Sequence, residues 1–595
     1  MTTEMTRREL GGLAAAAIAA NAARALAQTA GETGPPLDIA EWSYHWYGVE
    51  HAKLARGTMC NGGQMYVEHW IPREVRHPYP VVLIHGGHGQ GSQWFSTPEG
   101  HRGLATELLE QGYRVYVLDR PGQGRCPYHP WVHGYFDREA PTFEAVAASR
   151  KVDASDPAVA QAVAAMDQPM GNNPITQDLW RSRGAMLLDD IGPSILITQG
   201  DGSVFASLAA QERPKLVKGI VASEQSAESL RAELDQISAP APVPASPAPD
   251  PHPNRESTAL KLADQGCFWV GIGRKKMPYG TIAQGQMYVQ YMIPAEKRYP
   301  YPIVLVHGGG GQGCHMMGIG GRPGWVHYFV QAGYSVYWVD RPSYGRSPYH
   351  PDALGPSHLP NVPPYEPLVQ STAVFNTSQW PGPGGMNDPL VDQFMANERG
   401  NVMDEAFHSE LVWRGGAELL DRIGPSILLT HAFGGFFAWG VADRRPNLVK
   451  GIFAMEINGN PFERQLRWGL TAAPMTYDPP VTDPSQFRFV EQKLPADAPR
   501  PLVASYKLQA EPVHKWKNLE GIPIGWMTSE FGGGGSPVPN VEFLKQVGCS
   551  AEMVRLRDHG ILGNGNLMLL EKNNHEVFEV IREWLDRKVA GPKPA

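Results

Sequence analysis

The sequence predicts an α/β protein made of two tandem lobes, each with a mostly parallel sheet flanked by helices, the first lobe truncated. Two observations predict this. Short apolar runs typical of buried strands alternate with segments of helical periodicity, which is the order of a parallel sheet with helices on both faces. The same ordered motifs also occur twice along the 595 residues, a length that exceeds what one hydrophobic core holds.

The internal repeat keeps both the order and the spacing of its motifs. Gln64, in Gly-Gln-Met-Tyr-Val, recurs as Gln286, and the His-Gly-Gly run that begins at His85 recurs at His307. Both offsets are 222 residues (286 − 64 and 307 − 85). Later motifs recur with the larger offset of 232 (424 − 192), so the second copy has gained residues between them. Shared composition would not preserve motif order, so the sequence predicts a duplication.

Composition sets the expected boundaries. Arg7-Arg8 precede a small apolar stretch, and Ala25-Leu26-Ala27 is typical of a cleavage site. We therefore expect a twin-arginine signal and a periplasmic or secreted mature protein. No later run is long and apolar enough to span a membrane. The predicted segments are the signal peptide at 1–27, the truncated lobe at 38–238, a Pro/Ala-rich, semi-rigid linker at 239–256, and the complete lobe with cap regions at 257–590.

The overall composition excludes some functions. Hydrophobic residues make up 42% of the chain and charged residues 19%, as in an ordinary globular protein. A net charge of −8 gives no reason to expect nucleic acid as a partner. The five cysteines have no Cys-x-x-Cys or Cys/His spacing, which argues against a zinc site. We therefore expect neither a metal nor a cofactor.

The second lobe carries the fuller set of elements. We expect, in order, a hairpin at 286–293, strands at 303–306, 335–340, 427–429 and 451–456, a cap segment at 460–520, strands at 522–527 and 553–556, and a helix at 569–587. The first lobe ends at a strand over 219–223, without counterparts of the last two strands and the last helix. Its sheet should therefore have an open edge and an uncovered apolar face.

A strand, a tight glycine-rich turn and a helix follow one another at residues 424–440. The apolar run Ile427-Leu428-Leu429 leads into Thr-His-Ala-Phe-Gly-Gly, which is followed by a helical pattern. This context is typical of a nucleophile elbow, in which a strained turn exposes a reactive side chain. The middle residue of an elbow should be Ser, Cys or Asp. Here it is Ala432, which carries no nucleophile.

The motif order resembles the α/β-hydrolase superfamily, and in particular the secreted bacterial esterases with a Ser/Glu/His triad. The resemblance covers about residues 40–238 once and 257–590 a second time. It implies that Ala432 takes the nucleophile position, that Glu456 at the end of the next strand takes the acid position, and that Asn566 takes the histidine position. Asparagine can hydrogen-bond a glutamate but cannot act as a base near neutral pH. We expect the side chains of Glu456 and Asn566 to point toward Ala432.

The same resemblance implies an oxyanion loop. His307 is followed by Gly308, Gly309 and Gly310, where backbone N–H groups would face a developing oxyanion together with the N–H of Phe433. Two other histidines, His559 and His575, lie near the expected histidine position, and the favoured interpretation of both is a surface residue. In the first lobe Gly200 aligns with Ala432 and no histidine follows Glu224 at the right place. We therefore expect that lobe to be non-catalytic.

These residues indicate a relative of carboxylic-ester hydrolases that is catalytically degenerate. Two alternatives stay open: a secreted, non-catalytic ligand-binding pseudo-hydrolase, and an esterase whose nucleophile was replaced from Ser to Ala. Whether the chain is an enzyme therefore stays open as well. The expected ligand is a small apolar ester or an acyl or aromatic molecule. The aromatic residues of the cap regions would suit it, although ordinary core is the favoured interpretation of Trp380, Phe394, Trp413, Trp468, Tyr477 and Phe487.

The truncation has a consequence for stability and assembly. The second lobe or a second subunit should cover the open edge of the first lobe, so a homo-oligomer formed through that lobe is expected as one solution. Residues 28–238 expressed alone should be insoluble or bind a hydrophobic dye, whereas residues 254–595 should melt cooperatively. A monomeric first fragment with a sharp thermal transition would contradict this expectation.

Overall fold

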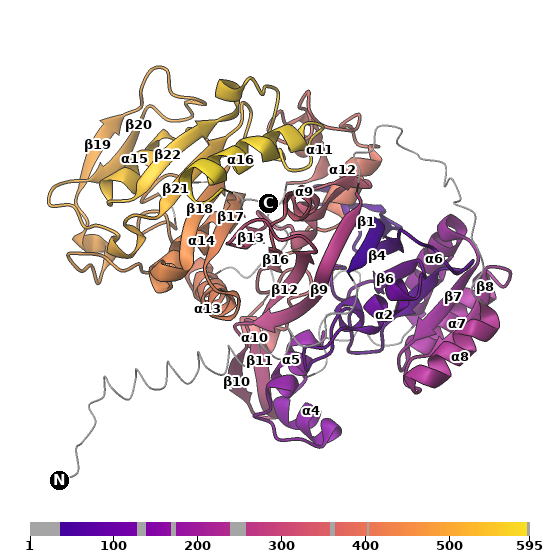
Figure 1. The fold of residues 1–595 in the computed structure, drawn as a ribbon. Helices are drawn as coiled ribbons and strands as arrows, with labels where there is room; N and C mark the ends of the chain where they lie inside the picture. Colours follow the sequence, from indigo (N-terminus) through magenta and orange to yellow (C-terminus); the bar gives the residue numbers. More distant parts are fainter. Residues whose placement is uncertain are drawn as a thin grey trace, which may run out of the picture.

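One 14-stranded sheet runs through the molecule, with helices on both of its faces (Figure 1). This is the α/β architecture that the sequence predicts, with a large and mostly parallel sheet. The computed structural model describes residues 36–127, 139–167, 174–238, 258–356, 363–400, 404–457, 459–463 and 465–591. The predicted signal peptide at 1–27 and the linker at 239–256 lie outside the described residues.

The first half of the chain supplies one end of the sheet, in the order β1-β4-β6-β5-β7-β8. β1 and β4 and then β4 and β6 pair antiparallel, and the strands beyond β6 pair in parallel. The bounds are β1 Leu37–Tyr47, β4 Met65–Pro72, β5 Val81–Ile84, β6 Val115–Asp119, β7 Ser194–Thr198 and β8 Val217–Ala222. The main helices are α2 Leu104–Glu110, α6 Pro174–Ile191, α7 Gly202–Glu212 and α8 Ala227–Ile237.

The second half supplies the other end, in the order β9-β12-β16-β13-β17-β18-β21-β22. Its first strands repeat the order of the first half, and β21 and β22 extend the sheet in parallel. The strands are β9 Leu260–Val270, β12 Met287–Pro294, β13 Ile303–Val306, β16 Val336–Asp340, β17 Ser426–His431, β18 Val449–Met455, β21 Pro523–Thr528 and β22 Ser550–Arg555. The main helices are α9 Trp325–Ala332, α12 Pro389–Met395, α13 Glu405–Ile423, α14 Gly435–Arg444, α15 Val538–Gln546 and α16 Asn574–Lys588.

Short hairpins lie outside the central sheet in the described part of the chain. Residues 286–293, expected as a hairpin, form the single strand β12 instead, because their antiparallel partner is β9 rather than the adjacent residues. The hairpins are β2 His51–Leu54 with β3 Gly57–Cys60, β10 Gly273–Met277 with β11 Gly280–Gln284, and β19 Phe489–Lys493 with β20 Ser505–Gln509. In the described part of the chain, no helix has both the length and the apolar character that crossing a bilayer requires.

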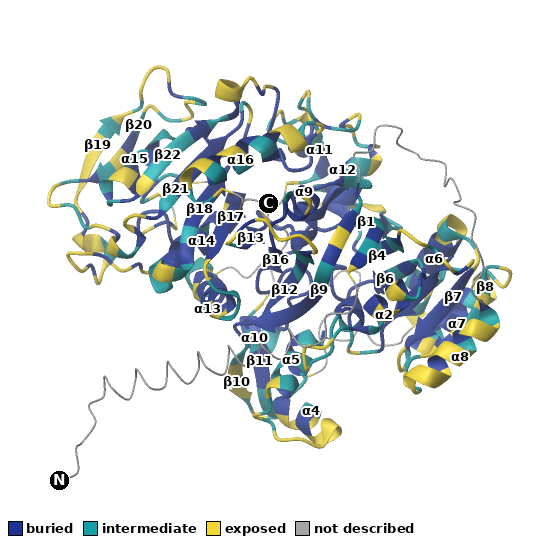
Figure 2. Cartoon of the chain, viewed as in Figure 1, coloured by how far each residue is buried: buried dark blue, intermediate teal, exposed yellow. Residues whose placement is uncertain are grey.

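The core lies on both faces of the sheet, and the central strands are the most buried part of the molecule (Figure 2). In β13, Ile303 and Leu305 belong to one apolar cluster and Val304 and Val306 to another, because successive strand residues face opposite sides. The first of these clusters contains residues of both halves, such as Val81 and Leu83 of β5. The two halves therefore share one hydrophobic cluster, and each half also has a cluster of its own.

The two halves meet through the edge strands β1 and β9. Leu37, Asp38 and Ile39 pair antiparallel with Leu262, Lys261 and Leu260, respectively. This pairing makes the sheet continuous, because each edge satisfies the backbone N–H and C=O groups that the other leaves open. The sequence does not predict this joint, because the missing strands of the first lobe lead us to expect a contact at its opposite edge.

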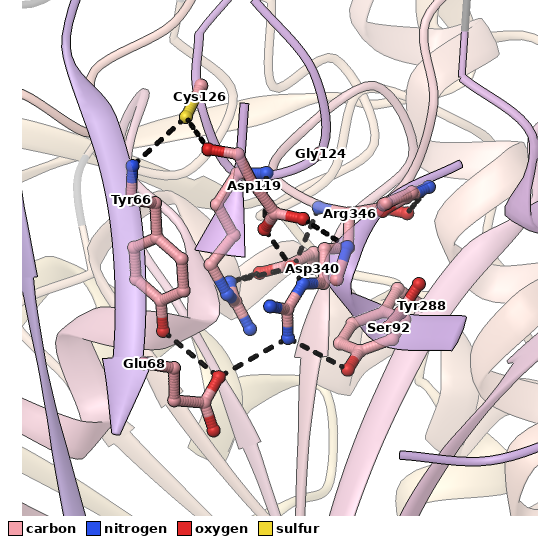
Figure 3. A network of polar contacts seen from close by, with 12 residues as sticks. Tyr66, Glu68, Ser92, Asp119, Gly124, Cys126, Tyr288, Asp340 and Arg346 are labelled. Atoms are coloured by element: carbon pink, nitrogen blue, oxygen red, sulfur yellow. Dashed lines mark hydrogen bonds and ion pairs between the residues drawn. The ribbon is translucent and has the colours of Figure 1, made fainter. Parts of the chain in front are cut away.

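Buried ion pairs are exchanged across the joint (Figure 3). Arg125 of the first half binds Asp340 of the second at 2.9 Å, and Arg346 of the second half binds Asp119 of the first at 3.0 Å. All four side chains are fully buried. Each aspartate also accepts a hydrogen bond from the backbone N–H of the arginine in its own half. Each acid therefore orders a loop in its own half while neutralising an arginine of the other half.

The two buried ion pairs are arranged almost symmetrically, and the two halves differ at one position between them. Glu68 of β4 and Gln290 of β12 occupy equivalent strand positions, and the Gln290 amide donates to Glu68 Oε1 at 3.1 Å. Glu68 also accepts from Arg346 Nη1 at 3.4 Å and from the Tyr66 hydroxyl (Figure 3). Two glutamates facing each other here would repel, because like charges strongly disfavour each other in a buried site. The amide at 290 replaces that repulsion by a hydrogen bond.

The truncated end of the first half differs from expectation in two ways. The edge strand β8 is not covered by the second half, which joins the sheet at the opposite end, so that part of the prediction is wrong. The apolar face beside β8 is nevertheless covered. A Cβ at Gly219 of β8 would lie 2.5 Å from Ile237 of α8, and a Cβ at the equivalent Gly451 of β18 would lie 2.6 Å from Val589, which follows α16. Helix α8 therefore stands in for α16.

This joint changes the reason to expect an unstable first fragment. Residues 28–238 alone should aggregate or bind a hydrophobic dye, because Asp119 and Glu68 would be buried without Arg346 and β1 would lose β9. Residues 254–595 should still melt cooperatively, at a lower temperature than they do in the full chain. Co-expression of both fragments as a control should restore a soluble pair. Thermal melts and dye binding of the separate fragments test this, and a sharply melting, monomeric first fragment would contradict it.

Candidate functional site

The turn after β17 has the geometry of an elbow. β17 ends at His431, a short 3-10 turn covers Ala432–Gly434, and α14 begins at Gly435. Ala432 has a φ of +46°, in the left-handed region. A residue with a Cβ costs about 1–2 kcal/mol there, so the surrounding packing must hold the turn in place. At the aligned position of the first half, Gly200 has a φ of +53°. Both halves therefore keep the turn, and neither places a nucleophile on it.

The glycine loop after β13 lies against this elbow. A Cβ at Gly308 would lie 2.7 Å from the Ala432 Cβ, so only glycine fits. His307 holds the loop from below: its Nδ1–H donates to Gly308 O, and its Nε2 accepts from the backbone N–H of Arg341 at 3.1 Å. The ring is thereby fixed as a structural bridge between β13 and β16. Burial also lowers its pKa well below the usual value, so it stays neutral.

Several backbone donors around the elbow have no acceptor in the described part of the chain. The N–H of Phe433 lies in the first helical turn, where no intrahelical acceptor exists. Among the described residues, no acceptor is found for the N–H groups of Gly309 and Gly310. Free N–H groups beside an elbow are what an oxyanion site requires. The structure thus places Gly308 against Ala432, next to Phe433, with Gly309 and Gly310 following in the same loop.

Glu456 and Ala432 follow the carboxyl ends of two adjacent parallel strands, β18 and β17. Its predecessor Met455 pairs with His431 in the parallel β17–β18 ladder, so the two residues that follow are neighbours. The carboxylate is 1% exposed and is fully engaged by other groups. Arg500 Nη1 donates to Oε2 at 2.8 Å, and the Ser529 N–H and hydroxyl donate to Oε1 at 2.6 and 2.9 Å. An arginine of the cap segment, and not an imidazole, is therefore the partner of this acid.

Asn566 reaches the elbow through its backbone. Its carbonyl accepts from His431 Nε2 at 2.8 Å, and its N–H donates to Ala373 O at 2.7 Å. In the structure as described, Glu456 and Asn566 share no hydrogen bond. The loop is held by Glu571, which accepts from the Gly565 N–H and from the Asn564 amide. Burial raises the pKa of Glu571 to about 7.

The other candidate histidines do not supply a base. His559 is exposed at the end of a 3-10 turn, and His575 is exposed near the start of α16, edge-on to Tyr328. His431 is buried beside Ala432 and donates its Nε2–H to the Asn566 carbonyl, which leaves the lone pair on Nδ1, the nitrogen that lies beside Gly308. Burial also lowers the pKa of His431. None of these three imidazoles hydrogen-bonds Glu456, although the charge of Glu456 acts on the buried His431 ring.

In the first half, acidic side chains occupy the space beside the elbow. Asp201 aligns with Phe433, and its Oδ2 lies 3.1 Å from where a Cβ on Gly87 would be. Glu224, the counterpart of Glu456, accepts from the Gly200 N–H at 2.5 Å. Arg120, the counterpart of Arg341, donates to Gly86 O at 2.8 Å. An internal carboxylate therefore lies over the glycine loop of this half.

Four exposed apolar side chains of the second half lie on the elbow itself or on loops next to Arg500, Ser529 and Asn566 in sequence. They come from loops that are tied together: the Phe531 N–H donates to Asn564 O, and the Gly563 N–H donates to Glu530. The four side chains are Phe433, Leu502, Phe531 and Leu562, with exposed fractions of 38, 75, 40 and 51%. An exposed apolar patch of this kind marks an interaction site for an apolar ligand. We refer to these four side chains as the apolar rim.

The aromatic residues singled out in the cap regions have a different role. Trp380, Phe394, Trp413, Trp468, Tyr477 and Phe487 are all buried and belong to the two large apolar clusters. They are core residues, which is the interpretation that the sequence favours.

The sequence did not indicate Arg500, Arg341 and Glu398, which lie at the site. Arg341 belongs to the repeated Asp-Arg-Pro motif, which was the one available signal, whereas Glu398 and Arg500 lie in segments without a motif.

Comparison with known proteins agrees with this geometry. No family model matches the chain. The probable secreted lipase phiG of Fungal sp. (strain ATCC 74256) is 35% identical over 318 residues, which are 51% of this chain and 86% of that protein. The chain belongs to the α/β-hydrolase superfamily. Within it, the chain is a relative of lipases and esterases, which agrees with the resemblance found in the sequence.

Solved structures of other α/β-hydrolases are more distant. A novel bacterial esterase is 21% identical, with a TM-score of 0.40, and the match covers 57% of this chain and 99% of that one. The naproxen esterase of Bacillus subtilis is 12% identical, with a TM-score of 0.27, and the match covers 54% and 91%. The duplication stays a prediction from the sequence.

Proposed function

We propose that this α/β-hydrolase binds an apolar ester or acyl ligand at the elbow of its second half and does not hydrolyse it through a serine triad. One observation carries the proposal: the residue on the strained turn is Ala432, with free backbone donors around it. The loop that would bind a carbonyl oxygen is retained, whereas the group that would attack the carbonyl carbon is missing. Binding without covalent chemistry is what remains.

The state of the acid supports the same conclusion. In a triad, the acid orients a histidine and stabilises its imidazolium form. Here Glu456 is paired with Arg500 and hydrogen-bonded by Ser529. The histidine position carries Asn566, whose backbone serves to hold His431. All three triad positions therefore support a non-hydrolytic site.

The apolar rim supports the class of ligand. Phe433, Leu502, Phe531 and Leu562 expose apolar surface beside donors that suit a carbonyl or carboxylate oxygen. That combination fits a molecule with one polar head and an apolar chain or ring. Secretion is part of the proposal, supported by the Arg7-Arg8 segment and by the name of the lipase relative.

A second candidate function is an esterase whose serine was replaced by alanine. The left-handed φ of Ala432 favours it, because alanine has no reason of its own to adopt that conformation. Asn566 opposes it, since a single replacement at 432 leaves the histidine position unexplained.

The purified protein should not react with a fluorophosphonate probe, because the probe needs an activated serine. Its turnover of p-nitrophenyl acyl esters should stay near the uncatalysed rate, since losing a triad nucleophile costs on the order of 10⁶ in turnover. Tryptophan fluorescence should still report saturable binding of a non-hydrolysable ester analogue. Labelling that maps to a serine in either half would refute the proposal and restore the esterase.

A further inference from the structure

Two buried ionisable side chains flank the glycine loop of the second half without forming an ion pair with each other. Arg341 and Glu398 are each 5% exposed. Arg341 is the nearest charge to Glu398, yet no ion pair within 4.0 Å joins them in the described structure. Buried charges are normally paired, and an unpaired one is costly. Among the described residues Arg341 has no carboxylate partner, and a bound anion would supply one.

Each of the two side chains has an unused polar atom. Arg341 Nη2 donates to Gly309 O at 2.6 Å and its guanidinium lies 4.6 Å from the centre of the Tyr344 ring, but its Nε has no acceptor. Glu398 Oε2 has no partner either. A Cβ at Gly310 would lie 2.5 Å from that oxygen, so the carboxyl group is directed at the loop.

The first half shows what fits such a loop. There the carboxylate of Asp201 lies over Gly87, with Arg120 as the neighbouring charge. In the second half the residue at that position is Phe433, and the space over Gly309 is open: a Cβ there would meet nothing within 4 Å. The first half therefore places an internal acid beside its loop, whereas the second half has Phe433 at that position. The two loops differ in backbone, since Gly309 has a φ of +47° and Gly87 does not adopt the left-handed conformation.

We propose that Arg341, Glu398 and the N–H groups of Gly309 and Gly310 form a subsite for the carboxylate of an acyl acid, in the place that Asp201 fills in the first half. The inference rests on the proposed function and names the polar head of its ligand. One carboxylate oxygen accepts from Arg341, and the other accepts from the protonated Glu398 and the loop N–H groups. Paired donors of this kind are what a carboxylate needs.

The protonation of Glu398 agrees with this arrangement. Burial raises the pKa of Glu398 to about 8, so at neutral pH it is a donor and not a repelling charge. The titratable groups that face it are Arg341 and Cys60. Burial raises the pKa of Cys60 to about 12, which keeps that thiol neutral. His315 lies across the loop, and burial lowers its pKa to about 3, so it stays neutral too.

Calorimetric titration of the full chain with decanoate and with methyl decanoate tests the subsite. Arg341→Gln should weaken decanoate binding about ten- to a hundredfold, because a charged hydrogen bond is lost, and should leave the ester nearly unaffected. The matched control is Arg120→Gln, which removes the equivalent guanidinium from the first half and should change neither affinity. Equal losses in both variants would overturn the proposal, since they would reveal a structural effect.

Two further measurements keep the test sharp. Wild-type affinity for decanoate should be constant to about pH 8 and then fall up to tenfold per unit as Glu398 ionises, whereas Glu398→Gln should be flat. Phe433→Asp should lose decanoate binding by placing an internal acid over the loop, and its neutral control Phe433→Asn should retain it. If methyl decanoate binds and decanoate does not, the subsite is wrong and the proposed function stands. If neither ligand binds, the proposed function fails as well.

Discussion

The double variant Ala432→Ser, Asn566→His should hydrolyse p-nitrophenyl esters at least about a thousandfold faster than the unchanged protein. The turn at 432 is already left-handed, so a serine there would present its hydroxyl without rebuilding the backbone. The backbone of residue 566 is anchored to Ala373 and His431, which should hold a new imidazole near the elbow. Steady-state turnover and fluorophosphonate labelling measure the effect.

The pairing of Glu456 limits how much activity returns. Arg500 donates to one of its oxygens and Ser529 to the other, so an imidazole at 566 must compete for the acid. Adding Arg500→Gln should raise turnover further by freeing Glu456. Ala432→Ser alone should stay inactive, because it lacks a base. Gly200→Ser is the control in the first half, and it should be inactive for the same reason. A folded double variant without turnover would contradict a retained ester-hydrolase geometry.

Replacing Arg346 by methionine should lower the free energy of unfolding by about 3–5 kcal/mol. The guanidinium is fully buried and binds Asp119 and Glu68 of the other half. Its removal leaves two buried carboxylates with too little positive charge. Arg346 also holds the pKa of Asp119 below its usual value, against the effect of burial, so the pair is ionic in the folded protein. Chemical denaturation measures the loss.

The control for that prediction is an arginine on the surface. Arg213 binds Asp189, and their side chains are 36 and 51% exposed. Arg213→Met should change stability by less than about 1 kcal/mol, because exposed ion pairs contribute little. If Arg346→Met were as mild as Arg213→Met, the exchanged pairs would not be what holds the halves together.

Local patterns account for most of what the sequence predicted correctly. The buried strand at Ile303–Val306 has the predicted bounds, and the strands at 335–340, 451–456 and 522–527 agree within two residues at each end. Apolar runs of this length between glycine-rich turns have few other ways to fold. The elbow could be located for the same reason, because a strand, a strained turn and a helix are contiguous in sequence.

The residue at which a helix begins, and the strand that a helix covers, were harder to predict. The last helix begins at Asn574 and not at 569, because residues 564–571 form the loop that Glu571 holds. The helix α8 was not expected, although its apolar residues Leu230 and Leu234 are four apart and join the core. Helix α8 covers the apolar face beside β8 through the contact of Ile237 with Gly219, and these two residues are distant in sequence.

The sequence by itself determined the succession of strands and helices along each half, the position of the elbow and the absence of a nucleophile at Ala432. Only the tertiary structure decided that β1 joins β9, that Arg125 and Arg346 cross to the acid of the other half, and that Arg500 binds Glu456. The physical reason is that periodicity and turn chemistry act over neighbouring residues. The partner of a buried charge depends instead on which surfaces meet, and these pairs join residues 44 to 227 positions apart.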